Sequence, residues 1–194
     1  MKNEVGEISG WWGTSNYNFT RPHLDTKGKF EQMYGRFECK AKVTNIKGLF
    51  PAFWTLSNEH LVNGIHSIKP EIDIFEHFNN SAKKQIGCSL HYGITYDMPD
   101  SKRTTSYLRW IDFSNKWAVY AAEWTKESIK WYINGELVKV FKISSMKDYE
   151  KPIVPMYIII NEGIRTESVL LKNKDKLPDG VEVDWIRVYA ERKN

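Results

Sequence analysis

The segment at residues 71–76 carries three carboxylates on what otherwise has the pattern of a buried strand. Its sequence is EIDIFE. On a regular strand, Glu71 and Asp73 point to one face, whereas Glu76 falls on the other. A one-residue β-bulge around Phe75 would restore the parity and bring all three acids into one row. Because bulges are over-represented beside active sites, the segment indicates a row of acids that could do chemistry.

Three carboxylates on one face repel one another, so at least one pKa must rise or a ligand must offset the charge. Two other interpretations stay open. The acids could form a solvated outer face, although no Lys or Arg is interleaved with them and aromatic residues flank them. They could also bind Ca²⁺ or Mg²⁺, although Ca²⁺ sites usually come from loops with carbonyl ligands rather than from a flat strand.

Glycoside hydrolysis is a reaction that uses this layout of acids. One carboxylate attacks the anomeric carbon while a second, protonated one donates to the leaving oxygen, and retaining enzymes hold the two roughly 5–5.5 Å apart. Glu71 and Glu76 could approach that separation if their side chains lean together across Asp73 on a concave face. The pattern therefore predicts Glu71 as the nucleophile, Glu76 as the general acid/base and Asp73 as an auxiliary acid that hydrogen-bonds to one of them.

The elements that must position these acids are short β-strands, because apolar and polar residues alternate along most of the chain. Asn134-Gly135 lies between two alternating runs and is a strong hairpin signal, since both turn positions need positive φ. No window of a dozen residues shows a helical stripe, and turn residues recur at short intervals. One all-β domain over residues 1–194 is expected, a sandwich or barrel. The expected strands are 37–43, 50–56, 71–76, 86–92, 117–124, 129–133, 136–140, 154–160 and 181–189.

The composition excludes several classes of protein. The chain has 194 residues, a net charge of +4, 41% hydrophobic and 27% charged residues, which is typical of a folded domain. No stretch approaches the roughly 18 apolar residues of a membrane span, and the scattered basic residues match no nucleic-acid motif. Neither a membrane nor a nucleic acid is therefore expected as a partner. Cys39 and Cys88 form no metal pattern; buried free thiols are expected, and a disulfide between them stays open.

Aromatic residues make up 14% of the chain and include 8 tryptophans, more than the core of such a domain usually requires. Some of these rings are therefore expected to face a ligand. Trp124, Trp131 and Trp185 lie within alternating apolar runs and are predicted to be core residues. The better candidates for a cleft wall lie in less regular segments: Trp11, Trp12 and Trp110.

Several segments resemble glycoside hydrolase family 16. EIDIFE has the E-x-D-x-x-E form of the bulged members of that family, such as laminarinases, agarases and carrageenases; lichenases lack the extra residue. Other similar motifs follow in the same order along the chain: YGRFECKAK at 34–42, GLFPAFW at 48–54, LHYG at 90–93, YAAEWT at 120–125, WYING at 131–135 and the closing strand at 181–189.

This resemblance implies a jelly-roll sandwich of two curved antiparallel sheets, of the concanavalin or lectin type, with the sugar chain in the cleft of the concave sheet. It implies the same roles for the three acids, in a retaining mechanism. It also points to Trp54 as a ring that stacks on a sugar, to His91 as a hydrogen-bond partner near the acid/base, and to Asn161 near the cleft. A core role for Trp54 and a structural role for His91 stay open.

The chain departs from the family pattern at its start, because the usual opening D-E-F-x-G strand is missing. The first strands are expected to be truncated or replaced by residues 1–25. Asp184 falls where many members bind a structural calcium, but the other half of that site comes from the missing region. Calcium is therefore a structural option only, and the reaction itself requires no cofactor.

The sequence thus predicts a monomeric, retaining endo-glycosidase acting on a β-linked polysaccharide, with β-1,3- or β-1,3-1,4-glucan as the first candidate. The alternatives are a hydrolase of a marine galactan such as agar, carrageenan or porphyran, and a catalytically inactive, lectin-like sandwich that binds glycans through its aromatic residues. The polymeric substrate and the resemblance imply secretion, or a place at the cell surface or in the periplasm. The first residues, MKNE, lack the apolar region of a signal peptide.

Overall fold

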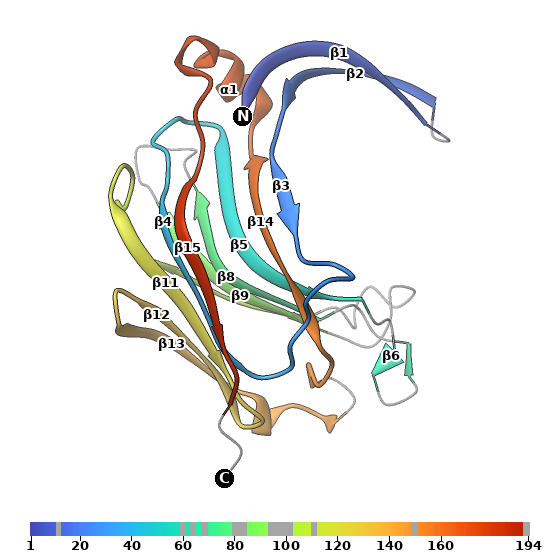
Figure 1. The fold of residues 1–194 in the computed structure, drawn as a ribbon, viewed down its shortest axis with the longest axis vertical. Helices are drawn as coiled ribbons and strands as arrows, with labels where there is room; N and C mark the ends of the chain where they lie inside the picture. Colours follow the sequence, from blue (N-terminus) through green and yellow to red (C-terminus); the bar gives the residue numbers. More distant parts are fainter. Residues whose placement is uncertain are drawn as a thin grey trace.

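Two antiparallel β-sheets pack face to face and curve together in the computed structural model (Figure 1). The structure describes residues 1–10, 13–58, 61–62, 65–66, 70–78, 85–92, 103–109, 112–148 and 151–191. The prediction of an all-β sandwich is confirmed. The six-stranded sheet contains, in spatial order, β10 (Arg103–Arg109), β9 (Gln85–Tyr92), β8 (Glu71–Phe78), β5 (Leu49–Ser57), β14 (Met156–Ile164) and β3 (His23–Asp25).

The second sheet has five strands and packs against the core-facing side of the first. Its spatial order is β13 (Glu136–Lys142), β12 (Ser128–Ile133), β11 (Trp117–Trp124), β4 (Gly35–Lys42) and β15 (Glu182–Tyr189). The turn between β12 and β13 is the predicted one: Asn134 has φ 50° and Gly135 has φ 83°, as an Asn-Gly hairpin requires.

Two hairpins and a short α-helix lie outside the two sheets. The first hairpin falls within residues 1–25, which were expected to replace the family's first strands or to be a truncated version of them, and the other two elements were not predicted. A hairpin of β1 (Lys2–Gly10) and β2 (Gly13–Thr20) lies beside the short helix α1 (Glu167–Leu171) at one end of the sandwich (Figure 1). Asn18 joins the two, because its Nδ2 donates to Oε1 of Glu167 at 2.8 Å. A further hairpin consists of β6 (Leu61–Val62) and β7 (Ile65–His66). No described helix has the length and apolar character needed to cross a membrane.

The core lies between the two sheets and follows from the alternation in the sequence. Along β4, every second residue is buried, beginning with Gly35. Trp124 and Trp131, with 0% and 2% exposure, confirm the predicted core tryptophans. Cys39 and Cys88 are both buried free thiols. Burial raises the pKa of each thiol to about 12, which makes them unreactive near neutral pH.

The prediction that Trp185 belongs to the core is wrong. Trp185 is only half-buried, and the guanidinium of Arg187 lies 4.2 Å from the centre of its ring. Its strand, β15, is at the edge of the five-stranded sheet, and Val183 and Ile186 are also exposed there. An alternating pattern shows that a strand has two different faces, but it does not show whether another element covers one of them.

Candidate active site

The acids are positioned by a bulge in β8, as predicted. Across the pairing of β8 with β9, Asp73 lies opposite Ser89 and Glu76 lies opposite Gly87. Three steps along β8 therefore correspond to two steps along β9, and β8 contains one extra residue between the acids. The register against β5 shifts at the same point. The extra residue brings Glu76 to the face that Glu71 and Asp73 already share.

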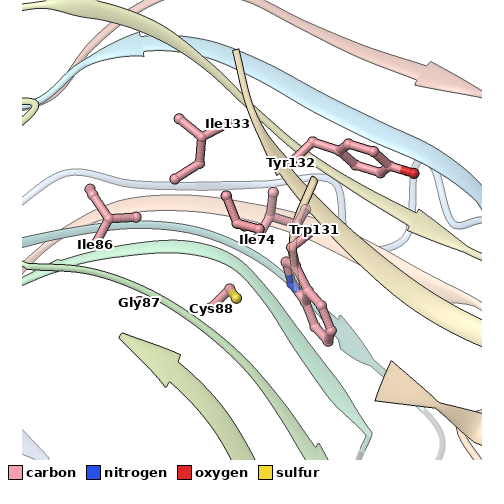
Figure 2. A pocket seen from close by; sticks show the side chains of 8 residues that line it. Ile74, Ile86, Gly87, Cys88, Trp131, Tyr132 and Ile133 are labelled. Atoms are coloured by element: carbon pink, nitrogen blue, oxygen red, sulfur yellow. The ribbon is translucent and has the colours of Figure 1, made fainter. Parts of the chain in front are cut away.

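The face of the bulge opposite the acids packs into the core. Ile74 and Phe75 are consecutive residues, yet both are buried, with 3% and 0% exposure. The indole N–H of Trp131, which comes from the other sheet, donates to the backbone oxygen of Asp73 at 2.8 Å. Figure 2 shows Trp131 beside Ile74 and Cys88 in this apolar layer. Because a bulge interrupts the ladder, such a donor from another element fixes the strand in its irregular path.

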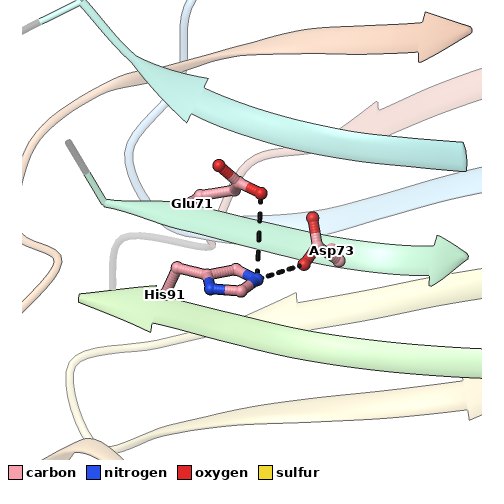
Figure 3. A group of neighbouring side chains, drawn as sticks. All are labelled: Glu71, Asp73 and His91. Atoms are coloured by element: carbon pink, nitrogen blue, oxygen red, sulfur yellow. Dashed lines mark hydrogen bonds and ion pairs between the residues drawn. The ribbon is translucent and has the colours of Figure 1, made fainter. Parts of the chain in front are cut away.

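The acids differ strongly in their exposure to solvent. The side chain of Glu71 is 30% exposed, whereas that of Asp73 is 3% exposed. Nε2 of His91 lies 3.0 Å from Oδ2 of Asp73 and 3.9 Å from Oε1 of Glu71 (Figure 3). Ser89 donates its hydroxyl to Oε2 of Glu76 at 3.3 Å. The side chains of His91 and Ser89, two residues apart on β9, thus connect the acids of β8 to the next strand.

Asp73 is the most buried of the three acids, and its pKa is raised. Burial raises the pKa of its carboxyl well above the ordinary value, and the negative charge of Glu76 raises it further. Hydrogen bonds with Glu71 and Ser89 act in the opposite direction without cancelling the effect. A protonated Asp73 can donate a hydrogen bond to Glu71, which favours the ionised form of Glu71.

Glu76 also has a raised pKa. Burial is the largest cause, and the charge of Glu71 adds to it, while His91, Ser89 and Arg165 lower the pKa in part. A carboxyl with a raised pKa keeps its proton to a higher pH, which suits it to act as a general acid. The site therefore combines one ionisable, partly exposed acid with a proton-holding acid on the same face.

One group of side chains here has the ligand types of a metal site. Glu71, Asp73 and His91 each offer a ligand atom, and these atoms lie within 4.8 Å of one another. A metal would require Asp73 to lose its proton, however, and the burial of Asp73 opposes that loss. Acid–base chemistry is the better match to this set of groups.

The acids open into a hollow whose walls include two further predicted residues, Trp54 and Asn161. Nε1 of Trp54 donates to Oδ1 of Asn161 at 2.7 Å, which fixes the plane of the indole ring. Trp54 is half-buried and faces the acids rather than the core. The residues lining the hollow are Phe50, Ala52, Trp54, Glu71, Asp73, Glu76 and Asn161.

The structure brings together most, but not all, of the predicted site residues. Glu71, Asp73, Glu76, Trp54, His91 and Asn161 are neighbours, although the hydrogen bond of His91 goes to Asp73 rather than to Glu76. Trp12 and Trp110, together with Trp11, lie outside the described residues. The sequence analysis missed Ser89, Phe50 and Ala52. Their spacing of two from His91 on β9, and of four and two from Trp54 on β5, could have indicated them.

Asp184 lies on the other sheet, outside this hollow. Its carboxylate accepts a hydrogen bond from the ammonium of Lys40 at 2.7 Å and is 46% exposed. Calcium needs six to eight oxygen ligands, and here a cationic side chain already contacts the carboxylate. The residues described around Asp184 do not fit a calcium ion, so that part of the sequence analysis gains no support.

The sequence and the fold agree with those of known proteins. The chain belongs to glycosyl hydrolases family 16, whose model matches residues 13–187. It is 25% identical over 181 residues to glucan endo-1,3-beta-glucosidase A1 of Niallia circulans, covering 87% of this chain and 26% of that protein. It is 28% identical over 169 residues to keratan-sulfate endo-1,4-beta-galactosidase of Sphingobacterium multivorum, covering 86% and 39%.

A solved structure, the laminarinase from Flavobacterium sp. UMI-01, superimposes on this chain with a TM-score of 0.67 at 26% identity. The match covers 95% of this chain and 77% of that structure. The resemblance to the family and the jelly-roll fold are thereby confirmed. Because the chain spans less than half of the length of the two relatives above, their activities are a guide to function rather than a finding about it.

Proposed function

We propose that this chain is a retaining endo-glycosidase that hydrolyses a β-linked polysaccharide. The observation that carries the proposal is the row of Glu71, Asp73 and Glu76, aligned by the bulge in β8 and opening into a hollow beside Trp54. One acid is partly exposed and two have raised pKa values, which is the division of labour that a double displacement requires.

In the first step, the carboxylate of Glu71 attacks the anomeric carbon and forms a glycosyl ester. The bond to the leaving oxygen breaks at the same time, and that oxygen takes the proton of Glu76. In the second step, Glu76 removes a proton from water, and the water oxygen bonds to the anomeric carbon. The bond to Glu71 breaks, so both carboxyl groups return to their starting states.

Asp73 acts on Glu71 rather than on the sugar. Its proton is retained by burial and is within hydrogen-bonding reach of Glu71, so it helps to hold the nucleophile ionised and correctly oriented. His91 contacts Asp73 from the neighbouring strand and limits how the Asp73 side chain can turn. These two residues are positioning groups in the proposed mechanism.

The first substrate class is β-1,3- or β-1,3-1,4-glucan, in line with the endo-1,3-beta-glucosidase and the laminarinase that resemble this chain. The second is a galactan, because a keratan-sulfate endo-1,4-beta-galactosidase matches a similar share of the chain. A polymer of either kind implies action outside the cytoplasm, either secreted or at the cell surface or in the periplasm. We propose that the protein acts as a monomer, because one chain carries all three acids.

A reducing-sugar assay across a panel of glucans and galactans tests the proposal, followed by NMR of the freshly released anomer. We expect cleavage of at least one β-linked polymer, with the β-anomer appearing first and the α-anomer only through mutarotation. If the α-anomer appears first, the mechanism is not retaining. Binding of a polymer without any cleavage would instead support a lectin-like protein.

A further inference from the structure

An arginine lies at the Glu76 end of the candidate cleft, against a pair of aromatic rings. Arg165 directly follows β14, and its guanidinium carbon lies 5.6 Å from the ring centre of Phe50 and 5.2 Å from that of Phe78. The two rings contact each other, with their centres 5.0 Å apart. Contacts of a guanidinium with aromatic faces are attractive, so the pair of rings holds the Arg165 head group in place.

This arrangement adjoins the acids of the candidate cleft. Phe50 is one of the residues that line the hollow with Glu76. Phe78 is two residues beyond Glu76 on β8, on the same face of the strand. The charge of Arg165 also acts on the Glu76 carboxyl, where it partly opposes the rise in pKa caused by burial.

The guanidinium has no polar partner within the described part of the chain. Arg36 provides a contrast, since its Nε lies 2.6 Å from the carboxylate of Glu38. Among the described residues, the guanidinium of Arg165 contacts only these two rings, and Arg165 is exposed. A guanidinium presents five N–H donors in a planar fork, a geometry that matches the oxygens of a sulfate or a carboxylate.

We propose that Arg165 binds an anionic substituent, a sulfate ester or a carboxylate, on a sugar held next to the bond that is cleaved. The proposal rests on the proposed glycosidase activity and adds a substrate class to it, namely polysaccharides that carry such groups. A neutral sugar could stack on Phe50 without this charge. An oxyanion on the substrate would accept hydrogen bonds from the guanidinium N–H groups, which have no partner in the described part of the chain.

The test compares neutral polymers with anionic forms of the same backbone. Laminarin is compared with sulfated and carboxymethylated laminarin, and desulfated κ-carrageenan with κ-carrageenan. Binding is measured by affinity electrophoresis in a Glu71→Gln background, which prevents hydrolysis. We expect Arg165→Gln to weaken binding of an anionic polymer about tenfold or more, and binding of its neutral counterpart by less than about twofold. The sulfated and carboxymethylated polymers show which anion is preferred.

Arg187→Gln is the matched control, because Arg187 also stacks on an aromatic ring but lies on the five-stranded sheet. It removes the same charge and should leave all the binding constants unchanged. Arg165→Lys keeps the charge without the planar fork and should restore binding only in part. The thermal midpoint of each variant shows whether it is folded.

Equal losses on neutral and anionic polymers, equal losses in Arg187→Gln, or no binding of any anionic polymer would overturn the proposal. Failure of the proposed function has a different signature. In that case the wild-type protein would release no reducing sugar from any of the polymers, whereas the charge-dependent difference in binding between the Arg165 and Arg187 variants would persist.

Discussion

Two strands of this molecule, β8 and β15, each carry acids beside a bulge, but in very different surroundings. In β15, Val183 lies opposite Ala41 and Trp185 lies opposite Lys40, so Asp184 is the extra residue. Its carboxylate contacts the ammonium of Lys40 at 2.7 Å. Every acid of β15 is exposed and lies next to a lysine, an arrangement that contributes little to stability in either direction.

In β8, the acids contact one another and the side chains of Ser89 and His91 on the neighbouring strand, and the charge of Arg165 acts on Glu76. Carboxylates therefore have different surroundings, and we infer different roles for them, on the two strands. An acid paired with a lysine at the surface needs no further explanation. Neighbouring acids that are buried or half-buried, as in β8, carry an electrostatic cost, and such a cost is most common where chemistry depends on it.

The largest effect is expected from removing the nucleophile. Glu71→Gln is nearly isosteric but cannot form the glycosyl ester, so kcat should fall by roughly 10⁴-fold or more. Steady-state kinetics on the best cleaved polymer measures the loss, and circular dichroism shows that the fold is retained. Wild-type activity in this variant on every cleaved polymer would show that Glu71 is not the nucleophile and that β8, like β15, carries no catalytic acid at this position.

Glu182→Gln is the matched control on β15. Glu182 is 55% exposed and its Oε1 lies 2.5 Å from Nζ of Lys42. Losing this exposed ion pair should change the free energy of unfolding by less than about 1 kcal/mol and leave kcat within about twofold. A large loss of activity here would mean that the acids of β15 take part in the reaction.

Asp73→Asn should separate stability from activity. The amide N–H is a weaker hydrogen-bond donor to Glu71 than the carboxylic O–H of Asp73, so kcat should fall by about 10²-fold or more. The substitution also removes a buried acid, so the variant should be at least as stable as the wild type at pH 8, where the carboxyl costs most. Asp184→Asn, which breaks the contact with Lys40, should leave both quantities almost unchanged. Thermal midpoints and kcat together test this; a lower midpoint with full activity in Asp73→Asn would contradict it.

A smaller effect is expected from Glu162, a buried acid of β14 outside the catalytic row. Its side chain has 0% exposure, Oε2 accepts a hydrogen bond from the backbone N–H of Val181 at 2.9 Å, and burial raises its pKa from 4.5 to about 8. Because the folded state holds this proton more tightly than the unfolded chain, the related stability is complete below pH 4.5 and is lost as the pH rises through about 8.

Urea titrations at a series of pH values measure this linkage. The free energy of unfolding of the wild type should decline towards pH 9, and Glu162→Gln should reduce the decline by roughly 1–3 kcal/mol. Glu182→Gln should leave the slope unchanged, since Glu182 is exposed. An identical decline in the wild type and Glu162→Gln would show that Glu162 does not titrate as its burial indicates.

The catalytic row could be predicted from the sequence because it depends on local rules. Parity along β8 required a bulge if Glu76 was to join Glu71, and the alternation around Trp124 and Trp131 indicated buried positions correctly. The Asn-Gly hairpin was equally predictable, since its positive φ values restrict the residue types. These features are determined by neighbours within a few positions of the chain.

The features that were missed depend on contacts between distant segments. Trp185 was placed in the core because its strand alternates, whereas its burial depends on whether another element covers β15. The hydrogen bond of Trp54 with Asn161 requires the register of β5 against β14, which no local pattern contains. Arg165 follows a buried strand without any motif, and its contact with both Phe50 and Phe78 exists only in the folded sheet.

Azide rescue tests the central claim, the assignment of Glu71 as nucleophile and Glu76 as acid/base, most directly. Glu71→Ala and Glu76→Ala are each incubated with azide and an aryl β-glycoside of an oligosaccharide, whose aryl alcohol is a good leaving group. In Glu71→Ala, azide should attack in place of the carboxylate and give the α-glycosyl azide. In Glu76→Ala, azide should attack the ester on Glu71 and give the β-glycosyl azide. The opposite configurations, or no glycosyl azide from either variant, would contradict the assignment.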